Sequence, residues 1–406
     1  MSVSRVVAWF VWIIVSIFYA YQYILRVMPS IMLNDITSQF HINATEFGQF
    51  SGVYYLGYSL LHLPIGIMLD RFGPRKVMTG CILLTVIGLL PIICAENWAY
   101  PLIGRALIGV GSSAAILGVF KIIRMTFNER LFPRMLSLSV MIGLLGAIYG
   151  GGPVSYLCQW LGYQQVVEIF IGMGLVLALI TWFIVPDTKP VQHESVRANI
   201  KTIFTNSKIM MMCFFAGLML GPLEGFSDVW GPVFLKEAYQ LNSATATYLP
   251  SMIYLGMCFG APVLSFIAEK TGYYLGTIIA SGLIMCLIFA LLITGILAVP
   301  SITVSFALVG VCCAYQILAI YKISTYVPED LAGLATAIAN MIIMIFGYAF
   351  HSTIGFVINA YGGVNDPQAF VYGIGVIPVT LAAGVIGFFI LAYQERTYLT
   401  GASATA

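Results

Sequence analysis

Charged side chains are scarce in this sequence. Asp, Glu, Lys and Arg together make up only 8% of its 406 residues, whereas a soluble domain carries about 25%. The mean hydropathy is correspondingly high, at +0.96. A single core could not hide so much apolar surface from water, so the composition excludes an ordinary soluble protein and predicts a polytopic membrane protein.

Patterns that would support chemistry or metal binding are missing as well. The eight cysteines fall within apolar stretches and have no metal-ligand spacing, so they are interpreted as small packing residues. No nucleophile, base and orienting group come together at a recognisable spacing, which excludes an enzyme. The net charge of +2 gives no reason to expect nucleic acid. We therefore expect neither a metal nor another cofactor.

What the sequence does contain is a series of twelve apolar segments, each near the roughly 20 residues that cross a bilayer as a helix. The predicted spans are 8–33, 45–68, 77–95, 98–121, 135–158, 164–185, 208–234, 243–267, 274–298, 301–324, 331–358 and 368–392. Fifteen of the eighteen Lys and Arg residues fall on one side of this topology, and only Lys236 falls in a loop on the other. Lys and Arg residues of membrane proteins concentrate in cytoplasmic loops, so both termini and the central loop are predicted to be cytoplasmic.

The chain also repeats itself. Its one long polar connector, 186–207, separates a predicted six-helix bundle at 1–185 from a second at 208–406. A shift of 199 residues places Tyr55-Leu56-Gly57 on Tyr254-Leu255-Gly256. Paired halves of this kind predict a substrate site at their interface, reached by rocking one half against the other.

The stretch "LDRFGPRK" at 69–76 is predicted to be a tight turn, with a worn copy "AEKTG" at 268–272. With its flanks, "GIMLDRFGPRK" resembles the signature loop of the major facilitator superfamily, and the resemblance covers the whole chain. It implies an all-helical fold of two pseudo-symmetric bundles and a cytoplasmic gate. The gating residues implied are Asp70, Arg71, Gly73, Arg75, Glu269 and Lys270, with Asp70 facing residues 331–335 when the inside is closed. The alternative is an anchor loop without a gating role.

A polar stripe marks the first predicted span, where Tyr19, Gln22, Tyr23 and Arg26 share one helical face in "YAYQYILRVMPSIM". Such a stripe must face protein or water rather than lipid. We predict that Arg26 lines the cavity and binds a carboxylate or another anion. The alternatives are a structural arginine paired with an acid, or one that reaches the outer interface. Pro29, which follows one turn later, is a candidate hinge.

Two acids lie at the corresponding place in the second half, Glu224 and Asp228 of "GPLEGFSDVW". They are four residues apart and share a helical face. Burial disfavours the ionised form, and two close acids resist double ionisation, so this pair is predicted to exchange a proton. With Arg26 it would also form a two-ended clamp for a zwitterion. The alternatives are an ion pair with Arg26 that holds the halves together and, for Asp228, a place at the outer interface.

Further polar side chains complete the predicted cavity. Arg105 opens "GRALIGVGSSAAILG", which resembles the fourth-helix pattern of the superfamily and implies either a part in proton transfer or a structural pairing. The glycine-rich stretch "GLLGAIYGGGP" at 143–153 only partly resembles the antiporter signature of the family, which weakens the case for efflux. Other substrate-binding candidates are Tyr54, Tyr55, Tyr58, Gln316, Asn340 and His351, each also explained by an interhelical hydrogen bond.

Together these patterns predict a proton-driven symporter that imports a small organic nutrient, most simply an amino acid or other carboxylate, by alternating access. The resemblance implies a monomer in a bacterial inner membrane. The sequence is also similar, more loosely, to the phagosomal nutrient transporters of intracellular gammaproteobacteria, which carry amino acids or nucleosides. One alternative is a proton antiporter that exports drugs or siderophores, which predicts a large apolar cavity. Another is a membrane receptor or scaffold that transports nothing.

Overall fold

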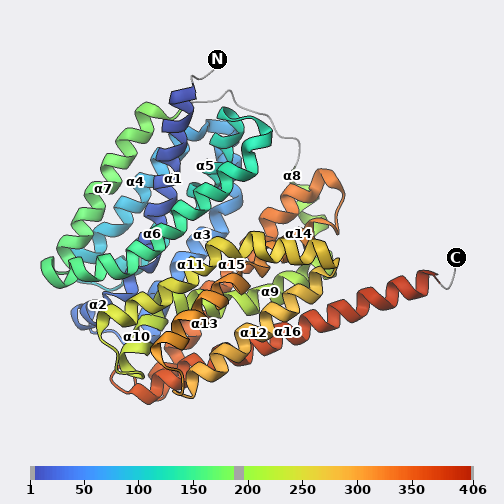
Figure 1. The fold of residues 1–406 in the computed structure, drawn as a ribbon. Coiled ribbons are helices and arrows are strands. Elements are labelled where there is room, and N and C mark those ends of the chain that lie inside the picture. Colours follow the sequence, from blue (N-terminus) through green and yellow to red (C-terminus); the bar gives the residue numbers. More distant parts are fainter. Residues whose placement is uncertain (1–4, 187–195, 404–406) are drawn as a thin grey trace.

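The computed structural model describes residues 5–186 and 196–403, and within these residues every regular element is a helix. Twelve helical segments are long and apolar enough to cross a membrane, which confirms the prediction of twelve spans. They form two bundles (Figure 1). The N-terminal bundle contains α1 (Arg5–Val27), α3 (Ala44–Phe72), α4 (Pro74–Cys94), α5 (Ala99–Thr126), α6 (Phe132–Leu161) and α7 (Tyr163–Ile184).

The C-terminal bundle begins after a connector that carries the short helix α8 (Val196–Phe204). Its spans are formed by α9 (Ser207–Gly225) with η3 (Phe226–Trp230) and α10 (Gly231–Glu237), α11 (Ser243–Thr271), α12 (Tyr274–Ile293), α13 (Val299–Cys313) with α14 (Tyr315–Ser324), α15 (Glu329–Ala360) and α16 (Pro367–Ser403). The remaining short elements are η1 (Met28–Ser30), α2 (Leu33–Phe40) and η2 (Glu129–Leu131). The exact division at 185 and 208 stays a prediction.

Local chemistry explains where several helices begin and end. Asn43 and Glu46 form a reciprocal capping box at the start of α3. Between α3 and α4 the chain reverses at Gly73, whose φ of +86° suits a residue without a side chain, and Pro74 starts α4. In the second copy Gly272 ends α11 with φ +70°. Both turns predicted from the sequence repeat are therefore present.

Three predicted spans are less regular than the sequence indicated. The first was expected to run to residue 33, but α1 ends at Val27 because Pro29 lacks the N–H that would continue it. The seventh contains the π-helical segment η3, which is closed by the bond from the Gly231 N–H to the Phe226 carbonyl. The tenth is divided into α13 and α14 at Ala314. Two of these irregularities lie beside ionisable residues.

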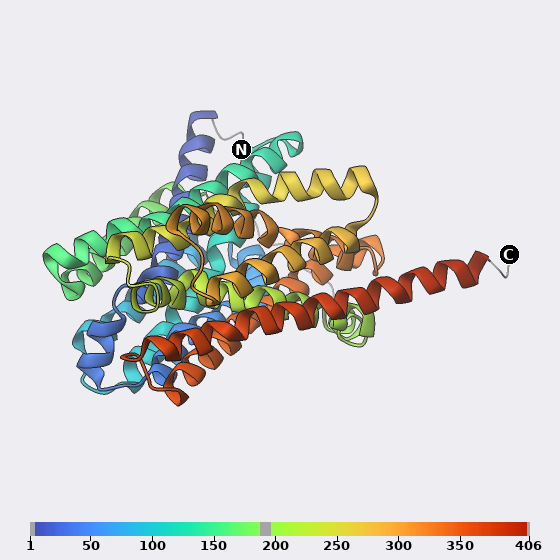
Figure 2. The same cartoon turned by 60° about the horizontal axis from the view of Figure 1, so that its bottom comes forward.

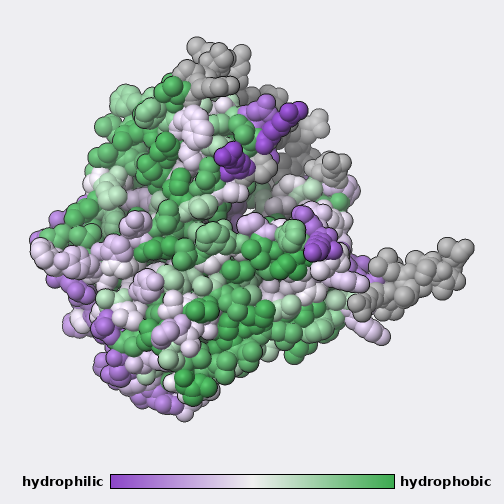
Figure 3. Space-filling view, viewed as in Figure 1, coloured by the Kyte–Doolittle hydropathy of each residue, from purple (hydrophilic) through white to green (hydrophobic). Residues whose placement is uncertain are grey.

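The surface matches the environment that the composition predicts. Hydrophobic side chains cover most of the visible face, and hydrophilic ones gather near two opposite ends of the molecule (Figure 3). We call the end that holds the start of α1, the α3–α4 turn and α8 the termini end, and the opposite end, with α2 and α10, the far end. Helix α16 runs beyond the bundle at the termini end (Figure 2).

The two bundles meet in their far halves, where α3 packs closely against α15. A Cβ added to Gly48 would overlap the backbone carbonyl of His351, and one added to Gly355 would overlap that of Ala44. On the other side of the interface, Gly151 of α6 lies against α11. Such close backbone approach is possible only with small residues. The structure is thus a state in which the far end is held closed.

At the termini end, two ion pairs each lie within one bundle. Lys121 Nζ of α5 lies 2.6 Å from Asp70 Oδ1 of α3, and Lys322 Nζ of α14 lies 3.2 Å from Glu395 Oε1 of α16. Arg75 Nε donates to the carbonyl of Val185 at 2.7 Å, joining the start of α4 to the end of α7. The latch from Asp70 to residues 331–335 belongs to the state with this end closed, and it remains a prediction.

Enlarging Gly48 should open the far end. In Gly48→Val the added atoms overlap the α15 backbone, and overpacking of this kind destabilises the closed interface by about 1–3 kcal/mol. We expect the distance between spin labels at Glu96 and Ile296, which lie exposed in far-end loops of the two bundles, to shift to longer values. Pulsed electron–electron double resonance measures this distance distribution.

Gly152→Val provides the matched control, because a Cβ at Gly152 of the neighbouring α6 would meet no atom within 4 Å. This variant should give the wild-type distance distribution. A wild-type distribution in Gly48→Val as well would show that the contact between α3 and α15 does not hold the far end closed.

Candidate functional site

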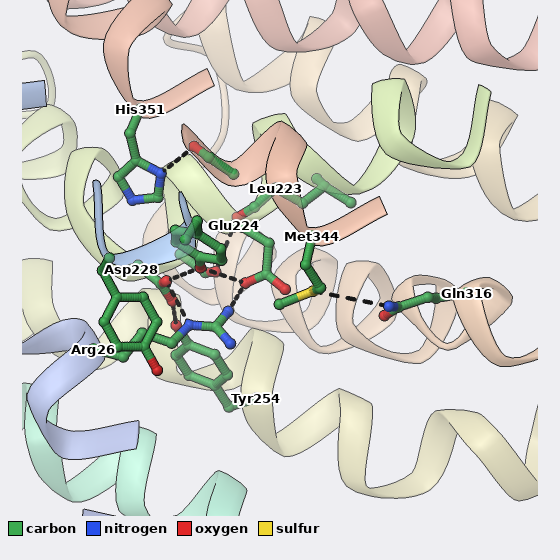
Figure 4. Close-up of polar contacts among 12 residues, drawn as sticks. Arg26, Leu223, Glu224, Asp228, Tyr254, Gln316, Met344 and His351 are labelled. Carbon is green, nitrogen blue, oxygen red and sulfur yellow. Dashed lines mark hydrogen bonds and ion pairs between the residues drawn. The ribbon is translucent and has the colours of Figure 1, made fainter. Parts of the chain in front are cut away.

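The centre of the structure holds three charged side chains from both bundles. Arg26 Nε of α1 lies 2.7 Å from Asp228 Oδ2 of η3, and its terminal nitrogen pairs with Glu224 Oε2 of α9. Figure 4 shows the guanidinium directed between the two carboxylates. Exposure is only 5% for Arg26, 7% for Glu224 and 1% for Asp228. Charges buried this deeply require partners, and here each bundle supplies the partner for the other.

Asp228 is the more fully satisfied of the two acids. Tyr55 of α3 donates a hydrogen bond to Oδ2, and Tyr254 of α11 donates one to Oδ1. With Arg26, both of its oxygens have donors. Glu224, in contrast, has Arg26 and only a long bond of 3.3 Å from the Tyr55 hydroxyl. Asp228 is therefore the more firmly held acid of the cluster, and Glu224 is the less firmly held one.

Aromatic rings surround the guanidinium. The Cζ atom of Arg26 lies 5.1 Å from the ring centroids of both Tyr23 and Tyr55. These cation–π contacts stabilise a positive charge that water cannot reach. Tyr19 continues this surface, with its ring 5.2 Å from that of Tyr23. The face of α1 predicted from the sequence is thus turned inward around Arg26.

Arg105 of α5 binds the backbone of α1 next to Arg26. It donates to the carbonyl of Leu25 at 2.5 Å and to that of Arg26 at 2.8 Å. The Leu25 carbonyl would normally bond to the N–H four residues later, which Pro29 lacks. Arg105 therefore supplies the donors that the break in α1 removes. Of its two expected roles, the structure shows the structural one, whereas proton transfer stays a prediction.

The remaining N-terminal candidates form hydrogen bonds or ring contacts within their own bundle. Tyr54 donates to Gln22 Oε1 at 2.5 Å, and its ring stacks on that of Tyr58 with centroids 6.1 Å apart. Tyr54 also lies under Arg105, whose Cζ is 4.9 Å from its ring centroid. For Tyr54 the interhelical hydrogen bond, the alternative considered above, is present, and Gln22 is its partner.

On the C-terminal side, Gln316 of α14 and Asn340 of α15 are paired. Gln316 Nε2 donates to Asn340 Oδ1 at 3.2 Å and lies 3.9 Å from the sulfur of Met344. Both amides are half-buried, and Met344 lies between Gln316 and Glu224 (Figure 4). His351 is bonded through Nδ1 to the carbonyl of Gly347, one turn earlier. The amide pair thus lies on the Glu224 side of the cluster.

Tyr254 was absent from the predicted site, whereas Tyr55 was one of the further cavity candidates, each also explained by an interhelical hydrogen bond. Their signal was present in the repeat, since the shift of 199 residues superposes Tyr55 on Tyr254. In the structure, the two repeat-related tyrosines bind the same carboxylate from opposite bundles. A search for polar residues at matched positions would have found both.

This arrangement suits the exchange of small charged species. One positive and two negative charges leave the cluster with a net charge of −1 when both acids are ionised, and a single proton neutralises it. A substrate carboxylate can take the place of Glu224 on Arg26, because both are planar acceptors for the guanidinium fork. Among the described residues, no group of His, Cys, Asp and Glu is arranged to hold a metal.

Comparison with known families gives one match that covers most of the chain. Residues 11–352 match the Major Facilitator Superfamily. Among solved structures, a bacterial homologue of the human lysosomal transporter Spinster, inward-facing and unoccupied, has the same fold. The TM-score is 0.74 at 14% identity, over 98% of this chain and 99% of that one.

Curated relatives are distant in sequence. The nitrite extrusion protein of Bacillus subtilis is 22% identical over 66% of this chain and 64% of its own length, slightly under two thirds of that protein. The chloramphenicol resistance protein CraA of Acinetobacter baumannii is 24% identical over 76% of each chain. Both similarities extend across several spans.

Removal of the Arg105 side chain should destabilise the protein. Arg105→Ala leaves two buried carbonyls on α1 without donors, at about 1–3 kcal/mol each. We expect the melting temperature in detergent to fall clearly, whereas Arg105→Lys, which keeps a donor, should recover part of the loss. Equal melting temperatures for Arg105→Ala and the wild type would contradict the bracing of α1.

Proposed function

Since the chain belongs to the Major Facilitator Superfamily, a family of secondary transporters, we propose that it imports a small organic nutrient bearing a carboxylate together with protons. The protein is a multi-pass membrane protein with twelve helical spans. We place the termini end in the cytoplasm of a bacterial inner membrane, because the basic residues gather there. The closer similarity to phagosomal nutrient transporters stays a prediction.

The observation that carries this proposal is that the central ion pair joins the two bundles. Arg26 and Tyr55 belong to the N-terminal bundle, whereas Glu224, Asp228 and Tyr254 belong to the other. Opening the far end moves these groups apart. A buried charge that loses its partner costs about 3–5 kcal/mol. The ion pair therefore ties reorientation of the carrier to what is bound at the cluster, as coupled transport requires.

A proton and a carboxylate together release this hold. Protonation of Glu224 removes its charge and frees one edge of the Arg26 guanidinium, while Asp228 keeps the other edge. A substrate carboxylate then takes the vacated position and restores the net charge of −1, whereas a zwitterionic amino acid leaves the cluster neutral. Because proton and substrate each favour the binding of the other, the two travel in the same direction. Symport follows from the charge of the substrate.

An amino acid fits this arrangement at both ends. Its carboxylate would lie on Arg26, and its ammonium would point to the side of Glu224 where Gln316 and Asn340 offer amide oxygens. Hydrogen bonds from the ammonium to these amide oxygens do not depend on the ionisation of Glu224. The proposal therefore ranks amino acids and other small carboxylates above nucleosides, which carry no carboxylate.

Export is the second candidate, favoured by the names of the two curated relatives, one an extrusion protein and the other a drug resistance protein. The same cluster would act differently on a cationic substrate. An amine would compete with the proton for Glu224, so the two would move in opposite directions. The charge of the substrate thus distinguishes symport from antiport at this site.

Glu224→Gln should uncouple transport from protons. The amide mimics protonated Glu224, so Arg26 stays available to a carboxylate while no proton is exchanged. In proteoliposomes we expect loss of accumulation driven by an inward pH gradient, with counterflow of the same substrate retained. Asp228→Asn is the comparison variant and should lose both activities, because it weakens the anchor of Arg26. Wild-type accumulation by Glu224→Gln would exclude Glu224 as the coupling residue.

The direction of coupling can be tested on the wild-type protein. A panel of amino acids, dicarboxylates, nucleosides and cationic drugs is offered to proteoliposomes with inward, absent and outward proton gradients. We expect carboxylates to accumulate only with the inward gradient. Accumulation of cationic drugs driven by the outward gradient, without carboxylate uptake, would instead establish the exporter.

A further inference from the structure

A groove of 680 Å³ lies on the outer surface of the N-terminal bundle, between α4 and α7. It is separate from the central cluster and makes no part of the proposed transport site. The side chains along it are almost all apolar, and its lining residues are Lys76, Thr79, Gly80, Leu83, Leu175, Val176, Ala178, Leu179 and Trp182. Exposure of 57% for Val176 and 60% for Leu179 shows that this lining faces outward.

The sequence pattern explains why a hollow forms here. On α4, residues 76, 79, 80 and 83 follow helical spacing and share one face, and residues 175, 179 and 182 do the same on α7. At Gly80 a side chain is missing from this face, and a Cβ there would meet no atom within 4 Å. The missing side chain at Gly80 therefore leaves a hollow on the outer surface between the two helices.

We propose that this groove binds an anionic phospholipid, with one acyl chain along Leu83, Val176 and Leu179 and the phosphate at Lys76. Both helices span the bilayer, so lipid is the solvent of this surface. The polar end of the groove lies at the termini end, where Lys76 gives positive charge and Trp182 an indole suited to the interface. Charge complementarity thus selects a lipid of net negative charge over a zwitterionic one.

The location gives such a lipid a mechanical role. The hydrogen bond from Arg75 Nε to the Val185 carbonyl, 2.7 Å long, joins the same two helices beside the polar end of the groove. A phospholipid held there contacts both α4 and α7, adjacent to the turn at Gly73 and to the start of the connector. Because it contacts both helices, the lipid would stabilise their packing at the termini end of the N-terminal bundle.

Native mass spectrometry of the delipidated full-length protein tests the proposal, with phosphatidylglycerol and phosphatidylcholine of identical acyl chains as probes. We expect the wild type to bind the first phosphatidylglycerol about 5-fold more tightly than phosphatidylcholine. Lys76→Gln should remove most of this preference. Gly80→Leu fills the groove and should weaken the binding of both lipids.

Two matched variants control for general effects of charge and bulk. Lys201→Gln removes a basic residue of α8 outside the groove, and Gly375→Leu fills an equally open position of α16 in the other bundle, so both should bind as the wild type does. Unchanged phosphatidylglycerol binding in both Lys76→Gln and Gly80→Leu would overturn the proposal. Full displacement of the lipid by millimolar inorganic phosphate would also overturn it, because the site would then be an anion site rather than a lipid site.

Discussion

The ion pair between Arg26 and the two acids of the opposite bundle is the interaction on which the remaining structure depends. These groups are almost fully buried, and within a membrane protein no water is at hand to replace a lost partner. The pair therefore does more than hold the bundles together. Any motion that separates them must first provide another neutralising group, and this requirement links reorientation of the carrier to what it binds.

Much of the surrounding structure serves to place these three side chains. Pro29 ends α1 just beyond Arg26, and Arg105 satisfies carbonyls that the break leaves exposed. A π-helical segment presents Asp228 from the other bundle, and such segments frequently occur at functional sites. Tyr55 and Tyr254 then fix the carboxylate from both sides. Irregular helix geometry thus occurs beside the buried charged residues, as expected where function sets the local structure.

The family explains the scaffold, and the central cluster explains the chemistry. A fold shared at 14% identity with a Spinster homologue shows that the same twelve-helix packing can form from very different sequences. The relatives named for extrusion and drug resistance are likewise distant. Substrate and direction must therefore follow from the individual side chains of the site, because a common fold hosts many functions.

The sequence by itself determined the class of protein, the twelve spans, the two halves and the short set of buried ionisable residues, because hydrophobic length and scarce charge are local properties of the chain. It also placed Arg26 and the acids at matching positions. Only the tertiary structure decided that two tyrosines bind Asp228 while Glu224 has fewer donors, and that Arg105 donates to the backbone of α1. Those roles depend on which helices touch, and contacts between residues some two hundred positions apart leave no trace in local periodicity.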